Sequence, residues 1–130
     1  MIEFHDVVID CRHPASLARF WASVLDGYFV APYDDQEVRR LRELGIEDLE
    51  DDPSVLLEAP PGKPRIWFQR VPEAKTVKNR IHLDLAASDL DADVARLVLL
   101  GAVRVHPPSP DSSLVVLRDP EGNEFCVVRR

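Results

Sequence analysis

The sequence predicts an α+β fold of two βαβββ modules, with curved mixed sheets that enclose a shared cavity and helices on the outside. Strand-like and helix-like segments recur in the same order in both halves, which indicates an internal duplication. The halves match at an offset of 76 residues, so that Asp6 aligns with His82. Each half alone would leave one sheet face uncovered, and two curled sheets can cover each other.

The first half begins with a strand and an amphipathic helix. Apolar and polar side chains alternate over residues 2–11, as a half-buried strand requires. Pro14 suits the first position of a helix over residues 14–26, and Gly27 suits its left-handed end. The core-facing stripe of this helix is Leu17, Phe20, Trp21, Val24 and Leu25. Further strands are expected at residues 28–32, 54–59 and 65–71.

An acidic insert, residues 34–52, interrupts these strands. It holds nine acidic residues and three arginines, and so supplies −6 of the formal net charge of −7. Residues 37–44 can form a short helix that buries Val38 and Leu41 and ends at Gly45. By contrast, residues 65–80 are basic; this island can attract an anion or serve as a solvated linker.

The second half repeats the order. In the strand expected at residues 80–87, Ile81, Leu83 and Leu85 face one way, and His82 and Asp84 face the other. A helix over residues 89–100 should follow, and Gly101 should end it.

Its N-terminus is predicted to be a capping box of Ser88 and Asp91. Strands are expected at residues 102–105, 113–118 and 124–129, and a turn at 119–123 joins the last two.

Composition excludes several classes of protein. A chain of 130 residues fits a single domain, with modules at about 1–72 and 79–130. No apolar run approaches the roughly 20 residues that span a bilayer, and no secretory signal is evident, so we expect no membrane partner and a cytoplasmic location. The net charge of −7 argues against nucleic acid. Cys11 and Cys126 are expected to be reduced, buried hydrophobes, although a disulfide stays open.

Polar residues on the faces opposite the helices are the candidate site. An imidazole and a carboxylate two residues apart, His82 and Asp84, share one face of a strand. We interpret them as candidate catalytic residues, although a hydrogen-bonded cavity histidine is the alternative for His82. The other candidates, for ligand binding, are Asp6, Asp10, Trp67, Gln69 and Cys126.

Three features together resemble a known superfamily. They are the aromatic pair Phe20-Trp21, the ending DPEGNEF at residues 119–125, and the run RIWFQRVPEAKTVKNRIHLDL at residues 65–85. The chain resembles the vicinal-oxygen-chelate superfamily, which includes glyoxalase I, bleomycin-resistance proteins and extradiol dioxygenases. The long run resembles the actinobacterial glyoxalase-like domain branch. The resemblance implies the duplicated fold and a homodimer.

The resemblance also implies where metal ligands would stand. Metal-using members carry four inward ligands, and the matching positions here are Asp6, Gln69, His82 and Cys126. Cys126 supplies a thiol where a glutamate is usual, so Asp6 is the one carboxylate of the four. Hard cations need oxygen ligands. We therefore expect no metal, with zinc as the alternative because it accepts imidazole, carboxylate and thiolate.

These observations favour a protein that binds a small molecule in the cavity without metal, like the bleomycin-resistance proteins. Three alternatives stay open. One is a metal-dependent lyase, isomerase or dioxygenase of the same superfamily. Another is an acid–base enzyme that uses His82 with Asp84, and the last is an interaction module with a filled cavity.

Overall fold

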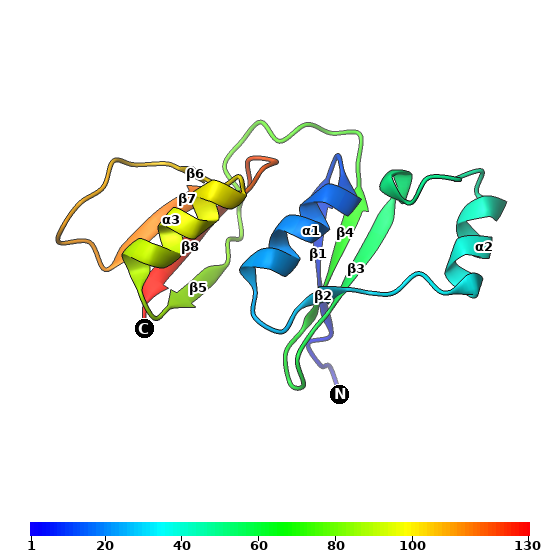
Figure 1. Ribbon diagram of the computed structural model, residues 1–130, viewed down its shortest axis with the longest axis horizontal. Helices are drawn as coiled ribbons and strands as arrows, with labels where there is room; N and C mark the ends of the chain where they lie inside the picture. The colour runs from blue at the N-terminus through cyan, green and yellow to red at the C-terminus, as the bar shows by residue number, and fades with distance from the viewer. The chain divides into compact units, whose positions relative to one another are not determined.

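The computed structural model describes residues 1–130 as two compact units, Met1–Ala74 and Lys75–Arg130, called here the first and second modules. Each module holds a four-stranded mixed sheet and a helix of 11 residues (Figure 1). The predicted α+β class with two βαβββ modules is confirmed. The cavity expected between them stays a prediction.

The first module has the sheet order β1-β4-β3-β2, in which β1 runs parallel to β4 and the other pairs are antiparallel. The acidic insert contributes α2 and a one-turn 3-10 helix, η1, between β2 and β3. The elements are β1 (Asp6–Cys11), α1 (Pro14–Val24), β2 (Phe29–Val30), α2 (Asp35–Glu43), η1 (Leu49–Asp51), β3 (Ser54–Glu58) and β4 (Arg65–Arg70).

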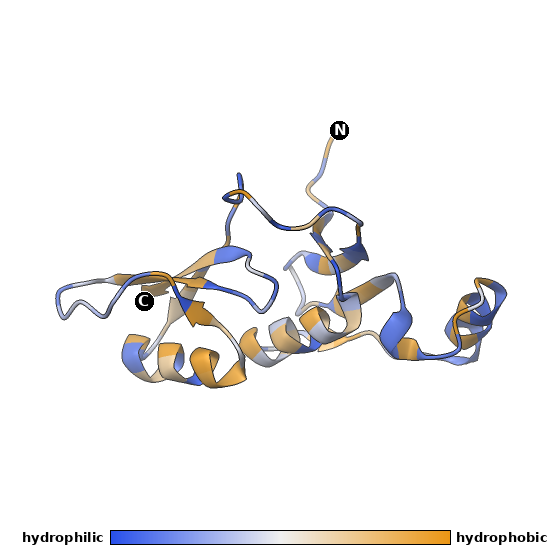
Figure 2. Cartoon of the chain, turned by 90° about the horizontal axis from the view of Figure 1, so that it is seen from above, coloured by the Kyte–Doolittle hydropathy of each residue, from blue (hydrophilic) through white to orange (hydrophobic).

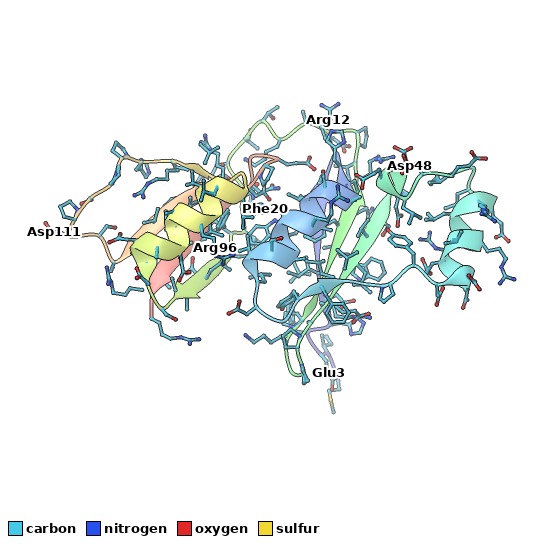
Figure 3. The ribbon with its side chains drawn as sticks, in the orientation of Figure 1. Glu3, Arg12, Phe20, Asp48, Arg96 and Asp111 are labelled. Atoms are coloured by element: carbon cyan, nitrogen blue, oxygen red, sulfur yellow. The ribbon has the colours of Figure 1, made fainter.

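The core of the first module lies between α1 and one face of its sheet. The predicted stripe of α1 is confirmed for Leu17, Phe20, Trp21 and Val24, which are all buried. Leu25 is only half-buried, because the helix ends at Val24 rather than residue 26. Phe20, labelled in Figure 3, meets Trp21 edge-on at a ring-centroid distance of 5.5 Å. The sheet residues buried in this core are Val55, Leu57, Ile66 and Phe68.

The second module repeats this architecture in the order β5-β8-β7-β6, with β5 parallel to β8. Apolar residues of α1 and α3 are orange in Figure 2; in α3 they include the buried Leu90, Val94 and Leu97. The elements are β5 (Asp84–Ala87), α3 (Leu90–Leu100), β6 (Val103–Arg104), β7 (Leu114–Arg118) and β8 (Glu124–Arg129).

Two predicted strands begin too early. Strand β1 starts at Asp6 rather than residue 2, because its partner β4 begins at Arg65, directly after a proline and a turn. Strand β5 starts at Asp84 rather than residue 80. Asp84 pairs with Cys126, and β8 begins only two residues earlier, so residues 80 and 81 have no strand beside them. Ile81 is consequently 83% exposed rather than buried on the helix side.

Two helix starts also differ from prediction. Asp89, rather than Ser88, caps α3: its carboxylate accepts from the Ala92 N–H at 3.1 Å. Its own N–H donates to the Asp93 carboxylate at 3.4 Å, so the reciprocal bond comes from two residues beyond the predicted Asp91. In the insert, Asp34 caps α2, which therefore begins at residue 35 rather than 37.

None of the helices is long and apolar enough to cross a membrane. Both cysteines are free thiols; Cys11 is buried and Cys126 is half-buried. The predicted burial is therefore confirmed for Cys11 but not for Cys126.

We expect Trp21→Ala to lower the free energy of unfolding by about 3–5 kcal/mol, because it removes a large buried aromatic side chain from the core. Trp21 is 2% exposed. The control is Asp48→Ala in the acidic insert, which removes only a cap of the one-turn helix and should cost at most about 1 kcal/mol. Urea unfolding measures both variants, and equal losses would contradict this description of the core.

Candidate functional site

The helix-free face of the first sheet carries the four candidate residues of that module. The register pairs Asp6 with Arg65, Val8 with Trp67 and Asp10 with Gln69. Residues directly opposite each other, and residues two apart, share one face of a sheet. The structure thus places Asp6, Asp10, Trp67 and Gln69 on one surface, as the alternation predicted.

Asp6 is already engaged by its neighbours. The Arg65 guanidinium donates to both carboxylate oxygens, from Nε at 3.1 Å and from Nη2 at 2.9 Å, and Trp67 Nε1 donates to Oδ2 at 3.0 Å. These bonds, the Arg65 bond first, lower the pKa of Asp6. A bidentate arginine saturates a carboxylate, so Asp6 is poorly placed to coordinate a metal or to receive a proton.

The second module brings together His82, Asp84 and Cys126. Asp84 and Cys126 face each other in neighbouring strands, and His82 precedes Asp84 by two residues. His82 Nε2 lies 3.3 Å from Asp84 Oδ1, and the donor atoms of all three residues lie within 4.8 Å of one another. The two side chains that the alternation placed on one face are therefore in contact with each other. Burial, followed by the nearby Asp84 charge, raises the pKa of the Cys126 thiol, which keeps it protonated and weakly nucleophilic.

A pocket of about 670 Å³ adjoins this cluster. It is lined by residues 75–78, which belong to the linker between β4 and β5, by residues 105 and 106, and by side chains of β7 and β8. His82 and Cys126 are among its lining residues. Its size lies within the range of small-molecule sites.

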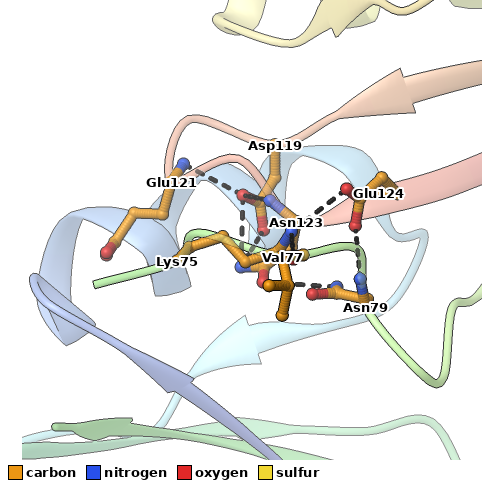
Figure 4. A network of polar contacts seen from close by, with 7 residues as sticks. All are labelled: Lys75, Val77, Asn79, Asp119, Glu121, Asn123 and Glu124. Atoms are coloured by element: carbon orange, nitrogen blue, oxygen red, sulfur yellow. Dashed lines mark hydrogen bonds and ion pairs between the residues drawn. The ribbon is translucent and has the colours of Figure 1, made fainter. Parts of the chain in front are cut away.

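The linker is fixed to the second sheet by the Glu124 carboxylate (Figure 4). Lys75 Nζ donates to Oε1 at 3.0 Å, and the Asn79 backbone N–H donates to Oε2 at 3.0 Å. Lys75 also donates to the Val77 carbonyl, within the linker. The Asn79 bond and then the Lys75 contact lower the pKa of Glu124 to about 2. One side chain of β8 thereby positions the linker side of the pocket.

The turn before β8 supports the same arrangement. Asp119, 2% exposed, accepts hydrogen bonds from the backbone N–H groups of Glu121 and Asn123, at 2.9 and 3.0 Å. Gly122 has φ of 89°, as predicted for the left-handed residue of this turn. The Asn123 side chain, bonded to Asp119, in turn accepts from Asn79 at 3.3 Å. The turn and the linker are therefore one connected polar network.

A smaller pocket of about 170 Å³ lies in the first module, where Trp67 and Leu56 meet the acidic insert. Tyr33 donates to Asp52 Oδ2 at 2.7 Å, and the Ser54 N–H donates to Asp52 Oδ1 at 3.0 Å. Burial and then the Asp52 carboxylate raise the pKa of Tyr33. With all these bonds made, Asp52 joins the end of the insert to β3 and has a structural role.

Sequence reasoning missed Lys78, Arg118 and Glu124 as residues of the pocket. Lys78 was part of a basic island that composition alone could not distinguish from a solvated linker. Arg118 and Glu124 flank the predicted turn, and their pairing across it was the available signal: equal distances from a tight turn place residues opposite each other.

Comparison with known proteins identifies the family. Residues 6–128 match the family model of the glyoxalase-like domain, so the chain belongs to the glyoxalase-like domain family. No curated protein is significantly similar to it in sequence.

Solved structures of low sequence identity share the fold. A glyoxalase/bleomycin resistance protein/dioxygenase family enzyme from Burkholderia phytofirmans has a TM-score of 0.66 and 19% identity, with 98% of each chain covered. A fosfomycin resistance protein from Mesorhizobium loti has a TM-score of 0.67 and 17% identity, over 98% of this chain and 92% of that one. A hypothetical protein from S. aureus has a TM-score of 0.68 and 15% identity, over 100% and 95%.

We expect Glu124→Gln to reduce the dependence of stability on pH in acid. The carboxyl has a pKa near 4.5 when unfolded and about 2 when folded, so its stabilisation is complete above pH 4.5 and is lost as the pH falls toward 2. Urea unfolding at several pH values between about 6 and 3 measures how the free energy of unfolding changes with pH.

Glu73→Gln is the matched control, because Glu73 is an exposed residue of the same linker region. It should keep the wild-type slope. A Glu124→Gln slope equal to that of the wild type would contradict the bonds assigned to Glu124.

Proposed function

We propose that the protein binds a small organic molecule in the pocket of the second module, in contact with His82, and that it uses no resident metal. The observation that carries the proposal is the meeting of a pocket of about 670 Å³ with the His82–Asp84 pair. Asp84 contacts Nε2 of the His82 ring, so Nδ1 is the ring nitrogen left to bond a ligand at the pocket. Trp67, Gln69, Asp10 and Asp6 stay predicted ligand-binding residues of the first module.

The divalent metal that the superfamily implies does not fit these residues. Mg²⁺ and Mn²⁺ need several oxygen ligands. Of the four expected positions, Asp6 is saturated by Arg65 and Trp67, Gln69 is neutral, and Cys126 supplies sulfur. We therefore derive no chemistry from such an ion.

Zinc is the second candidate, because one observation favours it. The imidazole, carboxylate and thiol of His82, Asp84 and Cys126 lie within 4.8 Å of one another, and zinc accepts all three donor types. That site would support a metal-dependent lyase or isomerase. Without zinc, the His82–Asp84 pair can still transfer a proton, so an acid–base enzyme remains compatible with the same pocket.

We also propose a homodimer in the cytoplasm and a place in the actinobacterial branch of the family. The dimer is supported by the four edge strands, β1, β2, β5 and β6, because edge strands expose unpaired backbone groups that a partner can cover. Light scattering at micromolar concentration should give twice the chain mass of 14.7 kDa. A single species of 14.7 kDa would contradict the dimer.

A thermal-shift screen of small fragments of varied charge tests the binding proposal. We expect some fragments to raise the melting temperature, since a ligand held only by the native state stabilises it. His82→Gln and Asp84→Asn should each lower the affinity for these fragments by about tenfold, which corresponds to the loss of one good hydrogen bond. Asp111→Asn, an exposed change in a loop of the same module, is the control and should leave binding unchanged.

Elemental analysis of the purified protein tests the metal-free proposal. We expect well below one zinc, manganese or nickel ion per chain. About one zinc per chain, lost in His82→Gln, would replace the proposal with the zinc site.

A further inference from the structure

The pocket of the second module is basic, although the protein is acidic. Residues 75–130 carry eight basic and eight acidic side chains, so the formal net charge of −7 arises within residues 1–74. Around the pocket this balance is not kept. Three cationic side chains, Lys75, Lys78 and Arg118, line it together with a single carboxylate, Glu124.

The one carboxylate is not available to Arg118. Arg118 and Glu124 stand directly opposite each other in β7 and β8, which is the arrangement of a cross-strand ion pair. Both Glu124 oxygens are instead bonded to the linker, to Lys75 Nζ and to the Asn79 N–H. Lys75 is thus neutralised, and Arg118 is left at the pocket without an acidic partner.

Lys78 is the second unneutralised cation. It forms no ion pair, and it lines the same pocket as Cys126 of β8. It therefore reaches toward β8 from the linker, while Arg118 extends from β7. Asp84, which does not line the pocket, is paired with His82 at 3.3 Å.

Apolar side chains share the pocket with these charges. Val77, Val105 and Val116 are among its lining residues. A ligand that matches the pocket therefore combines an apolar body with an anionic group, since a guanidinium and an ammonium both bind carboxylate and phosphate oxygens strongly.

We propose that the pocket of the second module binds a small organic anion, a carboxylate, phosphate or phosphonate with an apolar body, and that Lys78 and Arg118 hold its charged group. This inference rests on the proposed function and names the ligand class. Glu124 acts as a positioning residue, because it fixes the linker that presents Lys78 and leaves Arg118 unpaired.

NMR titration of the whole protein with phenylphosphonate, benzoate and their neutral analogue benzamide tests the inference. We expect saturable binding of both anions, with chemical-shift changes in residues 75–79 and in β7 and β8. Benzamide should bind about tenfold more weakly or not at all, because it lacks the charge-assisted bonds.

Lys78→Gln and Arg118→Gln should each lower the affinity for phenylphosphonate by about fivefold or more. Arg80→Gln is the matched control: it removes the same charge from the same exposed linker, but Arg80 does not line the pocket, so it should change affinity by less than about twofold. Arg118→Lys keeps the charge and should retain most of the affinity, which separates charge loss from a folding defect.

An equal loss of affinity in Arg80→Gln and Lys78→Gln would overturn the inference, because the anion would then respond only to the overall charge of the protein. If benzamide or cationic fragments bound at the pocket and phenylphosphonate did not, the anion assignment would be overturned and the proposed function would stand. If no fragment of any charge bound there, both would fail.

Discussion

The bonds of the Glu124 carboxylate are the constraint on which the second module depends. A linker of exposed polar residues has little apolar surface with which to hold itself against a sheet. Here one half-buried carboxylate binds the linker at two points, Lys75 and the Asn79 N–H. The pocket has a defined wall because of these bonds, and Arg118 remains unpaired because of the same bonds.

The two modules use equivalent positions differently. In the duplicated arrangement Asp6 corresponds to His82. Asp6 is bound by Arg65 and Trp67 and is fixed within its own sheet. His82 is paired with the exposed Asp84 and borders the larger pocket, where a ligand can reach it. Duplication supplied two similar frameworks, and differences at a few side chains separate a structural position from a candidate functional one.

The fold could be predicted because its determinants are local and periodic. Most of the stripe of α1 and the left-handed Gly101 at the end of α3 appear directly in the sequence, and the structure bears them out. Gly27 is left-handed as predicted, but α1 ends before it, at Val24. Strand ends could not be predicted in the same way, because β5 begins only where its partner β8 lies beside it, whatever the alternation of residues 80–83.

The site was predicted only in part for a related reason. Spacing alone placed His82 near Asp84. The roles of Lys78, Arg118 and Glu124 depend on which carboxylate bonds which cation, and this choice is made in three dimensions. A charge pattern predicts a basic surface, but it does not tell which charge stays unpaired.

The most direct test of this account is a crystal structure of the protein with phenylphosphonate. The account predicts phosphonate oxygens within hydrogen-bonding distance of Lys78 Nζ and of the Arg118 guanidinium, with Glu124 still bonded to Lys75 and to the Asn79 N–H. An ion pair between Arg118 and Glu124, with the linker released and the phosphonate absent from the pocket, would contradict it.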